Sequence, residues 1–278
     1  MNRVIGAALL GFALILPTFG ARQALAQAPA YPQHGNIDYA YVPPDNIRFV
    51  PLMRRLKARR LLEQLSEFLA PLRLPHAFFL ETKQCNTVNA FYNPDTWSLN
   101  ICYELVEFIE GVAPKADSPV EGLTRDDVVT GALVGVVLHE LGHGVFDMLQ
   151  VPVFGREEDA ADQMASFIAL QFNKDVAQAL VRGYAYLYLA FGGAPTDWGA
   201  YSDEHGTNPQ RFYNTLCLGY GGDPAAFKDF VDRGWLPPGR AENCAAEYQQ
   251  LKHAFATTIL PFIDQEQTKA VQGRQWLK

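Results

Sequence analysis

The feature that most constrains the fold is a run over residues 128–141 that is apolar on every side of a helix except at His139 and Glu140. Thr124, followed by Asp127 three residues later, has the pattern of a capped helix start. A helix that is apolar all round is stable only when protein surrounds it. The sequence therefore predicts a helix at the centre of the domain that carries two polar residues into the core.

The rest of the chain predicts an α+β, mainly helical domain. β-strand patterns cover 37–42 and 77–81, and β-forming residues on both sides of a turn cluster indicate a hairpin over 87–103. Leucines at helical spacing predict one helix over 52–69. Further helices are expected over 104–110, 156–172, 175–191, 209–218, 224–233 and 241–259. We expect the small sheet, with its hairpin, to lie over the central helix.

The first 26 residues have the layout of a cleavable secretory signal. Arg3 precedes an apolar run over 4–16, and small residues end at Ala26. The run is too short to stay as a membrane anchor, and no later stretch is long and apolar enough to replace it. We therefore expect cleavage after Ala26, a single domain over 27–278, and an exported protein, periplasmic or secreted, without a permanent membrane anchor.

Charge and cysteine content indicate which partners the protein can bind and in which compartment it is found. The 23 basic and 30 acidic residues give a net charge of -7, which disfavours nucleic acid as a partner. An even number of cysteines suits an oxidising compartment. Of the three possible pairings we expect Cys85 with Cys102 and Cys217 with Cys244, because each closes a short local loop. The first bridge is expected across the base of the hairpin.

The segment His139-Glu140-Leu141-Gly142-His143 matches the H-E-x-x-H pattern. Histidines four apart lie on one face of a helix, so that both imidazoles can bind one zinc ion at about 2.0 to 2.1 Å. Glu140 follows the first ligand and can take a proton from a water molecule. The sequence thus predicts a site for one Zn²⁺ per chain, with His139 and His143 as ligands and Glu140 as general base.

A third ligand is expected at the start of the next helix, where four acidic residues gather. Glu158 and Asp162 share a face, which would let Glu158 bind the metal while Asp162 reaches the outer nitrogen of a ligand histidine. Glu157 is the main alternative as third ligand, and acids at a helix start also act as simple caps. Asp147, one turn beyond His143, is a weaker candidate for the third ligand and is expected instead on the polar surface.

These motifs resemble known peptidases. The HELGH segment with a downstream Glu-x-x-x-Asp looks like the gluzincin branch of zinc peptidases, which implies a zincin-like fold with Glu158 as third ligand and Asp162 behind it. The segments REEDAADQMA and SDEHGTNPQRFYNTLCLGYG resemble a bacterial family of exported proteins classed as metallopeptidases, whose substrates are undefined. Gluzincins often supply a later side chain to stabilise the oxyanion, which suggests His205, with Tyr201 and Tyr213 as alternatives.

The stretch Asn89-Ala90-Phe91-Tyr92 is similar to the Asn-Ala-Phe segment of the HtpX-like peptidases, where it belongs to the edge strand beside the substrate. We therefore expect zinc-dependent hydrolysis of a peptide or protein substrate that lies extended along this strand. Two alternatives stay open at this point: a non-catalytic exported zinc-binding scaffold, and a zinc amidase acting on cell-wall material. The sequence leaves the physiological substrate and the oligomeric state open.

Overall fold

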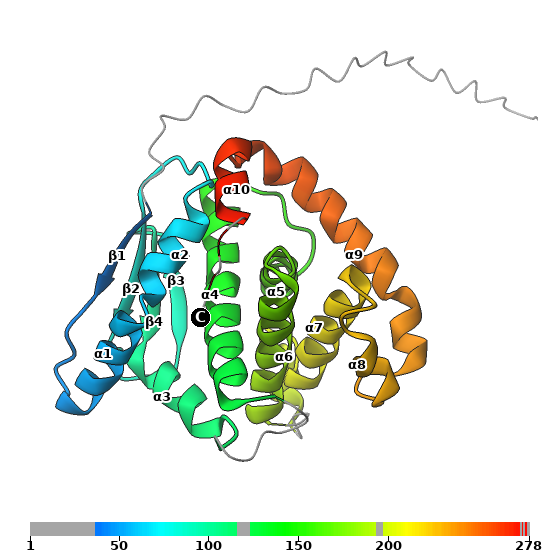
Figure 1. Cartoon of the computed structure of the whole chain (residues 1–278), viewed down its shortest axis with the longest axis horizontal. Coiled ribbons are helices and arrows are strands. Elements are labelled where there is room, and N and C mark those ends of the chain that lie inside the picture. The colour runs from blue at the N-terminus through cyan, green and yellow to red at the C-terminus, as the bar shows by residue number, and fades with distance from the viewer. Residues whose placement is uncertain (1–36, 116–122, 193–196, 273, 275, 277–278) are drawn as a thin grey trace, which may run out of the picture.

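The computed structural model describes residues 37–115, 123–192, 197–272, 274 and 276, so the predicted signal sequence lies outside the described residues. The predicted α+β class is confirmed, because the described chain is mainly helical and has one small sheet (Figure 1). The strands are β1 Ile37–Tyr41, β2 Phe78–Lys83, β3 Ala90–Asn93 and β4 Ser98–Cys102. The helices are α1 Val50–Ala58, α2 Leu61–Leu69, α3 Tyr103–Val112, α4 Arg125–Met148, α5 Glu157–Ala169, α6 Lys174–Ala190, α7 Asn208–Gly222, α8 Lys228–Asp232, α9 Pro238–Thr258 and α10 Gln265–Gln272, with 3-10 turns η1 Ile47–Phe49, η2 Trp198–Ser202 and η3 Leu260–Phe262.

The sheet is mixed, with the strand order β1-β2-β4-β3. The predicted hairpin is confirmed: β3 pairs antiparallel with β4, and Ala90 lies opposite Ile101. The pairs β1–β2 and β2–β4 are parallel, and every residue of β4 is buried. The hairpin leaves β3 at one edge of the sheet, where it packs against α4 (Figure 1).

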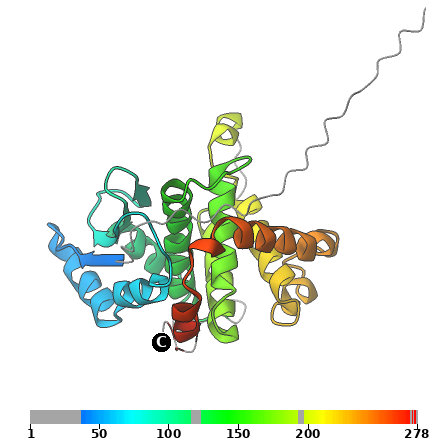
Figure 2. The ribbon, with the colours of Figure 1, turned by 90° about the horizontal axis from the view of Figure 1, so that it is seen from above.

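Helix α4 forms the centre of the domain, as its apolar sequence predicts. The sheet lies on one side of it and helices α5 to α9 on the other (Figures 1 and 2). The predicted cap is present, because the Thr124 hydroxyl accepts the Asp127 N–H at 3.1 Å. The expectation that no later stretch is long and apolar enough to cross a membrane is wrong, because among the described residues α4 alone reaches that length and apolar character. However, 72% of its most apolar window is buried inside the fold, as in the core helix of a globular domain.

The prediction of a single helix over 52–69 is wrong, because α1 ends at Ala58 and a separate helix, α2, begins at Leu61. Arg60, between α1 and α2, has left-handed backbone with φ of 53°. The Tyr41 hydroxyl of β1 accepts the N–H of Leu62 at 2.9 Å and so caps the start of α2. The helical spacing of the leucines continues through the break because both helices bury their leucines in the same core. The break itself depends on Tyr41, which lies in a strand distant in sequence.

Glycines allow α4 to approach its neighbouring helices closely. A Cβ at Gly131 of α4 would lie 2.8 Å from the Cα of Gly183 in α6, which is a clash. A Cβ at Gly142 would lie 3.1 Å from the Cα of Ala161 in α5. This close approach at Gly142 brings the acidic start of α5 beside the histidines of α4, which is why the site forms there.

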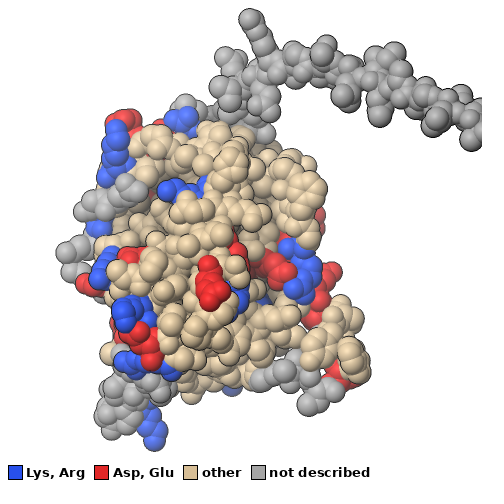
Figure 3. Space-filling model, turned by 90° about the vertical axis from the view of Figure 1, so that its right-hand side faces the viewer, with Lys and Arg blue, Asp and Glu red and all other residues tan. Residues whose placement is uncertain are grey.

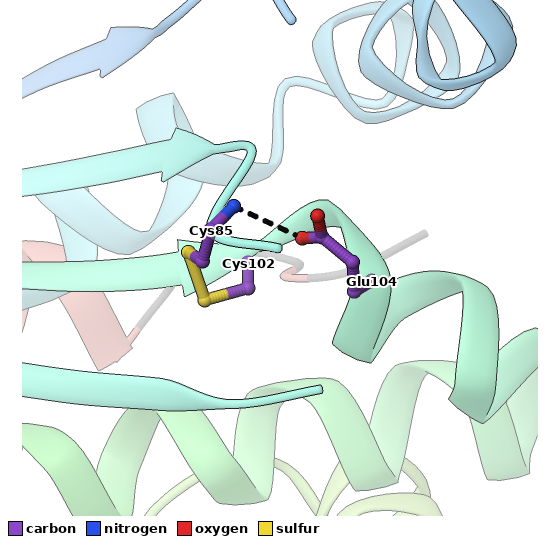
Figure 4. Close-up of side chains that lie close together, drawn as sticks. All are labelled: Cys85, Cys102 and Glu104. Atoms are coloured by element: carbon purple, nitrogen blue, oxygen red, sulfur yellow. Dashed lines mark hydrogen bonds between the residues drawn. A yellow bond between two sulfur atoms is a disulfide. The ribbon is translucent and has the colours of Figure 1, made fainter. Parts of the chain in front are cut away.

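Both predicted disulfide pairings are confirmed. Cys217–Cys244 joins α7 to α9, whereas Cys85–Cys102 joins the end of β4 to the segment that follows β2 (Figure 4). The expectation that Cys85–Cys102 crosses the base of the hairpin is wrong, because this bridge ties two neighbouring parallel strands, β2 and β4. The buried Glu104 also holds the backbone on one side of the bridge. Its carboxylate accepts hydrogen bonds from the N–H groups of Cys85 at 3.1 Å and of Asn86 at 2.8 Å. The bridge thus fixes the loop that leads into β3.

Replacing either cysteine pair by serine should lower the free energy of unfolding by about 2 to 5 kcal/mol, because each bridge restricts the unfolded chain. The sequence separations of 17 and 27 residues are close enough to predict similar losses. Urea denaturation would measure both. Only loss of Cys85–Cys102 should also speed amide hydrogen exchange in the segment before β3, since that bridge anchors it. Equal exchange of that segment in both double variants would contradict this role.

Candidate active site

Helix α4 presents His139, Glu140 and His143 in a cavity of about 350 Å³. The two Nε2 atoms of the histidines lie 3.3 Å apart, so both rings face one point. His139 is buried and His143 is half-buried. The described residues that line the cavity are Asn89, Ala90, Phe91, Tyr92, His139, Glu140, His143, Glu157, Glu158 and His205. The fold therefore brings together ten of the residues singled out in the sequence.

Glu158, in the first turn of α5, reaches both histidines. One carboxylate oxygen lies 3.0 Å from His139 Nε2 and the other lies 3.5 Å from His143 Nε2. The ligand atoms of these three residues lie within 4.8 Å of one another and could hold a metal ion. A second group in the described chain, Cys85, Cys102 and Glu104, offers no thiolate because its cysteines form a disulfide.

The carboxylate of Glu158 carries a buried oxygen, Oε2, that has no hydrogen-bond partner among the described residues. Nevertheless, the Nε2 atoms of His139 and His205 lie 3.0 and 2.8 Å from it. Burial alone would raise the pKa of the Glu158 carboxyl, but the contacts with His139, His143 and His205 outweigh it and hold the pKa well below its usual range. A buried carboxylate of this kind is stabilised by a nearby positive charge, which a cation between the rings would supply.

Asp162, one turn after Glu158, lies behind His139. Its Oδ1 is 2.8 Å from His139 Nδ1 and accepts hydrogen bonds from the hydroxyls of Tyr184 at 2.7 Å and Tyr188 at 3.0 Å. Arg211 of α7 makes two further bonds to the carboxylate, at 2.6 and 2.7 Å. Burial alone would raise the pKa of Asp162, but the bonds from His139 and Arg211 outweigh it and hold the pKa well below its usual range. Asp162 thus stays ionised and fixes the orientation of the His139 ring.

Glu157, the alternative third ligand, lies on the outer side of His143. Its carboxylate is 2.7 Å from His143 Nδ1, the nitrogen that faces away from His139, and its side chain is 54% exposed. Each histidine therefore has its own carboxylate at Nδ1, Asp162 for His139 and Glu157 for His143. This arrangement leaves both Nε2 atoms directed at the space beside Glu158.

Glu140 lies between the metal-binding group and strand β3. Its Oε2 accepts the backbone N–H of Tyr92 at 2.9 Å. Burial raises the pKa of the Glu140 carboxyl above its ordinary value, although the two histidines and the Tyr92 N–H oppose this. A carboxylate that is held in place and has a raised pKa suits proton transfer near neutral pH.

Asp147, expected on the polar surface, instead accepts a hydrogen bond from the Tyr92 hydroxyl at 2.8 Å. The ring of Tyr92 also packs on Phe78, with centroids 6.1 Å apart. Tyr92 therefore connects β3 to α4 twice, through its N–H at Glu140 and through its hydroxyl at Asp147, one turn beyond His143.

Tyr92→Phe should reduce turnover several-fold and leave KM and metal content nearly unchanged, because β3 would lose the bond that holds its N–H against Glu140. The lost bond should also reduce the free energy of unfolding by about 0.5 to 1.5 kcal/mol. Steady-state kinetics and urea denaturation would measure the two effects. Tyr39→Phe, at an exposed position of β1, serves as the control. Unchanged turnover in Tyr92→Phe would show that the hydroxyl does not position Glu140.

His205, in the segment before α7, lies at the open side of the cavity. Its Nε2 is 2.8 Å from Glu158 Oε2, its Nδ1 is 2.9 Å from an oxygen of Asp203, and its side chain is 45% exposed. It is outside the group of three mutually close ligands. The alternatives Tyr201 and Tyr213 are 52% and 38% exposed and are not among the residues that line the cavity.

Sequence reasoning missed Arg211, Tyr184 and Tyr188. Arg211 lies within a segment that carries the family resemblance, but its pairing with Asp162 depends on how α7 packs on α5. The two tyrosines are four apart on α6 and buried, so their spacing resembles that of ordinary core residues. The one signal in the sequence is that two residues with hydroxyl groups occupy core positions of the same helix, where each hydroxyl needs a hydrogen-bond partner.

Two histidines and a glutamate from neighbouring helices, each histidine with a further carboxylate, form a group that could hold a metal ion, and such ligand sets are typical of metal-dependent hydrolases. The chain matches a protein family described as "putative metallopeptidase" over residues 41–259, well over half of its 278 residues, and it belongs to that family. No match was found among curated proteins or among solved structures. The family match thus agrees with the site in pointing to peptide hydrolysis that requires a metal.

Proposed function

We propose that this protein is an exported zinc metallopeptidase of the gluzincin type. The observation that carries the proposal is the convergence of His139, His143 and Glu158 in one cavity with Glu140. A zinc ion about 2.0 to 2.1 Å from tetrahedral ligands separates the ligand atoms by roughly 3.3 Å. The separations here are 3.0, 3.3 and 3.5 Å, so the donor set fits one zinc ion in each chain.

In this mechanism a bound zinc ion supplies Lewis acidity to the scissile carbonyl and to a water molecule. Glu140 accepts the proton of the attacking water and then passes it to the leaving amine. The N–H of Tyr92 keeps the Glu140 carboxylate oriented for both transfers. His205, at the open side of the cavity, donates a hydrogen bond to the tetrahedral oxyanion through Nε2.

The substrate would lie extended along β3, with the segment from Asn89 to Tyr92 beside the scissile bond. This position is supported by the sheet order, which puts β3 at an edge, and by the four residues lining the cavity. An edge strand can bind an extended peptide through main-chain hydrogen bonds. Such recognition favours unfolded segments, since folded proteins rarely present an extended backbone.

Export through an N-terminal signal over 1–26 belongs to the same proposal, with a mature domain over 27–278. The two disulfides support it, because such bonds persist in oxidising compartments. Export could be tested by tagging the C-terminus and locating the protein in cell fractions, together with N-terminal sequencing of the mature chain.

The test of function is hydrolysis of an unfolded protein such as reduced casein by the purified protein. We expect cleavage that a chelator abolishes and added zinc restores. Cleavage that persists after the protein has been stripped of metal would overturn the proposal. Hydrolysis of cell-wall peptides but not of casein would favour the amidase alternative. Stoichiometric zinc without hydrolysis of any amide would favour the scaffold.

A further inference from the structure

A second cavity, of about 320 Å³, lies on the far side of the helices that carry the candidate metal ligands. Its described lining residues come mainly from α5, α9 and α10, with others from the end of α2 and from α4. Its walls are mainly apolar and include Leu141, Met164, Ile168, Phe255, Ile259 and Trp276. Leu141 lies between the two histidines in sequence but faces away from them into this space.

One charged side chain, Lys252, occurs among the described residues that line this cavity. Lys252 is exposed, which places it at the mouth, and no ion pair to it occurs in the described part of the chain. On the face of the molecule seen in Figure 3, uncharged residues cover most of the surface. The ammonium group of Lys252 at the mouth of an apolar cavity favours an anionic group on a ligand.

The size and lining of the cavity indicate a ligand. Protein interiors seldom contain voids much larger than a water molecule, whereas ligand pockets begin at about 300 Å³ and are mainly apolar with a few polar groups. A bound peptide would bring backbone amides into this space, and each would need a hydrogen-bond partner. The polar side chains of the lining are few: Gln171, Asn173, Lys252, Gln265 and Thr268. An alkyl chain needs no such partners.

We propose that this cavity binds a free fatty acid with a single alkyl chain of about 12 to 16 carbons. The alkyl chain lies between α5 and α9, in contact with Met164 and Ile168, and the carboxylate pairs with the Nζ of Lys252 at the mouth. The volume of the cavity, about 320 Å³, is at the lower end of the range for ligand pockets. It therefore suits one alkyl chain better than the two chains of a phospholipid.

The test is calorimetric titration of the purified protein with dodecanoate and hexadecanoate below their micelle concentrations. We expect saturable binding of one fatty acid per chain. Ala256 is exposed and lines the cavity, so Ala256→Trp should block the mouth and abolish binding. Ala254→Trp, exposed on the same helix but outside the lining, should bind normally and is the matched control.

The head group is tested with Lys252→Glu, which should weaken dodecanoate binding on the order of tenfold or more. Lys57→Glu, at an exposed position of α1 outside the lining, should have no effect. Circular dichroism would verify that each variant is folded. Absence of saturable binding, equal binding by Ala256→Trp, or equal affinity for dodecylamine would overturn the proposal. So would tighter binding of an apolar tripeptide that displaces dodecanoate. None of these readouts depends on hydrolysis, so the outcome is independent of the peptidase proposal.

Discussion

Glu140→Gln should retain zinc and reduce peptide hydrolysis by about 10² to 10⁴-fold, the usual contribution of a positioned general base. Glutamine has nearly the same shape and can still accept the Tyr92 N–H through its side-chain carbonyl. It cannot accept a proton from water, so the lost step is proton transfer and not binding. The expected result is therefore a lower kcat with KM and metal content close to those of the wild type.

The measurement needs the metal content and the kinetics of the same preparation. Inductively coupled plasma mass spectrometry would give zinc per chain, and a quenched fluorescent peptide would give kcat and KM. Asp147→Asn, which changes a carboxylate of α4 that does not line the cavity, is a matched control and should lose much less activity. Full activity in Glu140→Gln would remove Glu140 from the mechanism.

The same variant would also help to find the substrate. Because it should bind a substrate without cleaving it, comparison of cleavage products made by wild type and by Glu140→Gln isolates the products that depend on this site. Such a comparison suits this site, because recognition along an edge strand is mainly through the backbone and tolerates many side chains.

The parts of the fold that sequence reasoning predicted correctly depend on local spacing. The cap at Thr124, the buried character of α4 and the shared face of His139 and His143 follow from neighbouring residues alone. The hairpin of β3 and β4 also follows from its own turn. The disulfide pairs were predictable because both bridges close short loops.

The parts that sequence reasoning missed depend on contacts between distant segments. The break at Arg60 is fixed by Tyr41, and the parallel pairing of β2 with β4 has no signature in either strand. Asp147 looks like a surface residue until Tyr92 is brought beside it. In the same way, no local pattern reveals that Arg211 would bind Asp162. The two histidines and Glu140 are therefore predictable from local spacing, whereas the residues that orient them depend on contacts between distant segments.

Glu158→Ala should weaken zinc binding more than Glu157→Ala, and the comparison tests the assignment of the third ligand. Glu158 lies 3.0 and 3.5 Å from the Nε2 atoms of both histidines, whereas Glu157 contacts only the outer nitrogen of His143. Loss of an outer carboxylate typically costs about 10 to 100-fold in metal affinity. We expect Glu157→Ala to fall in that range and Glu158→Ala to lose more than about 100-fold, because it removes a ligand.

Competition with a chromophoric zinc chelator would measure both affinities. Asp159→Ala is the matched control, because Asp159 is the next acid along α5 and pairs with Arg156, away from both histidines. It should bind zinc like the wild type. The three variants alter successive acids in one helix turn, so any general effect of charge at the helix start appears in all of them. If Glu157→Ala lost more affinity than Glu158→Ala, the third ligand would be Glu157, and Glu158 would have to act instead through His205, which it approaches at 2.8 Å.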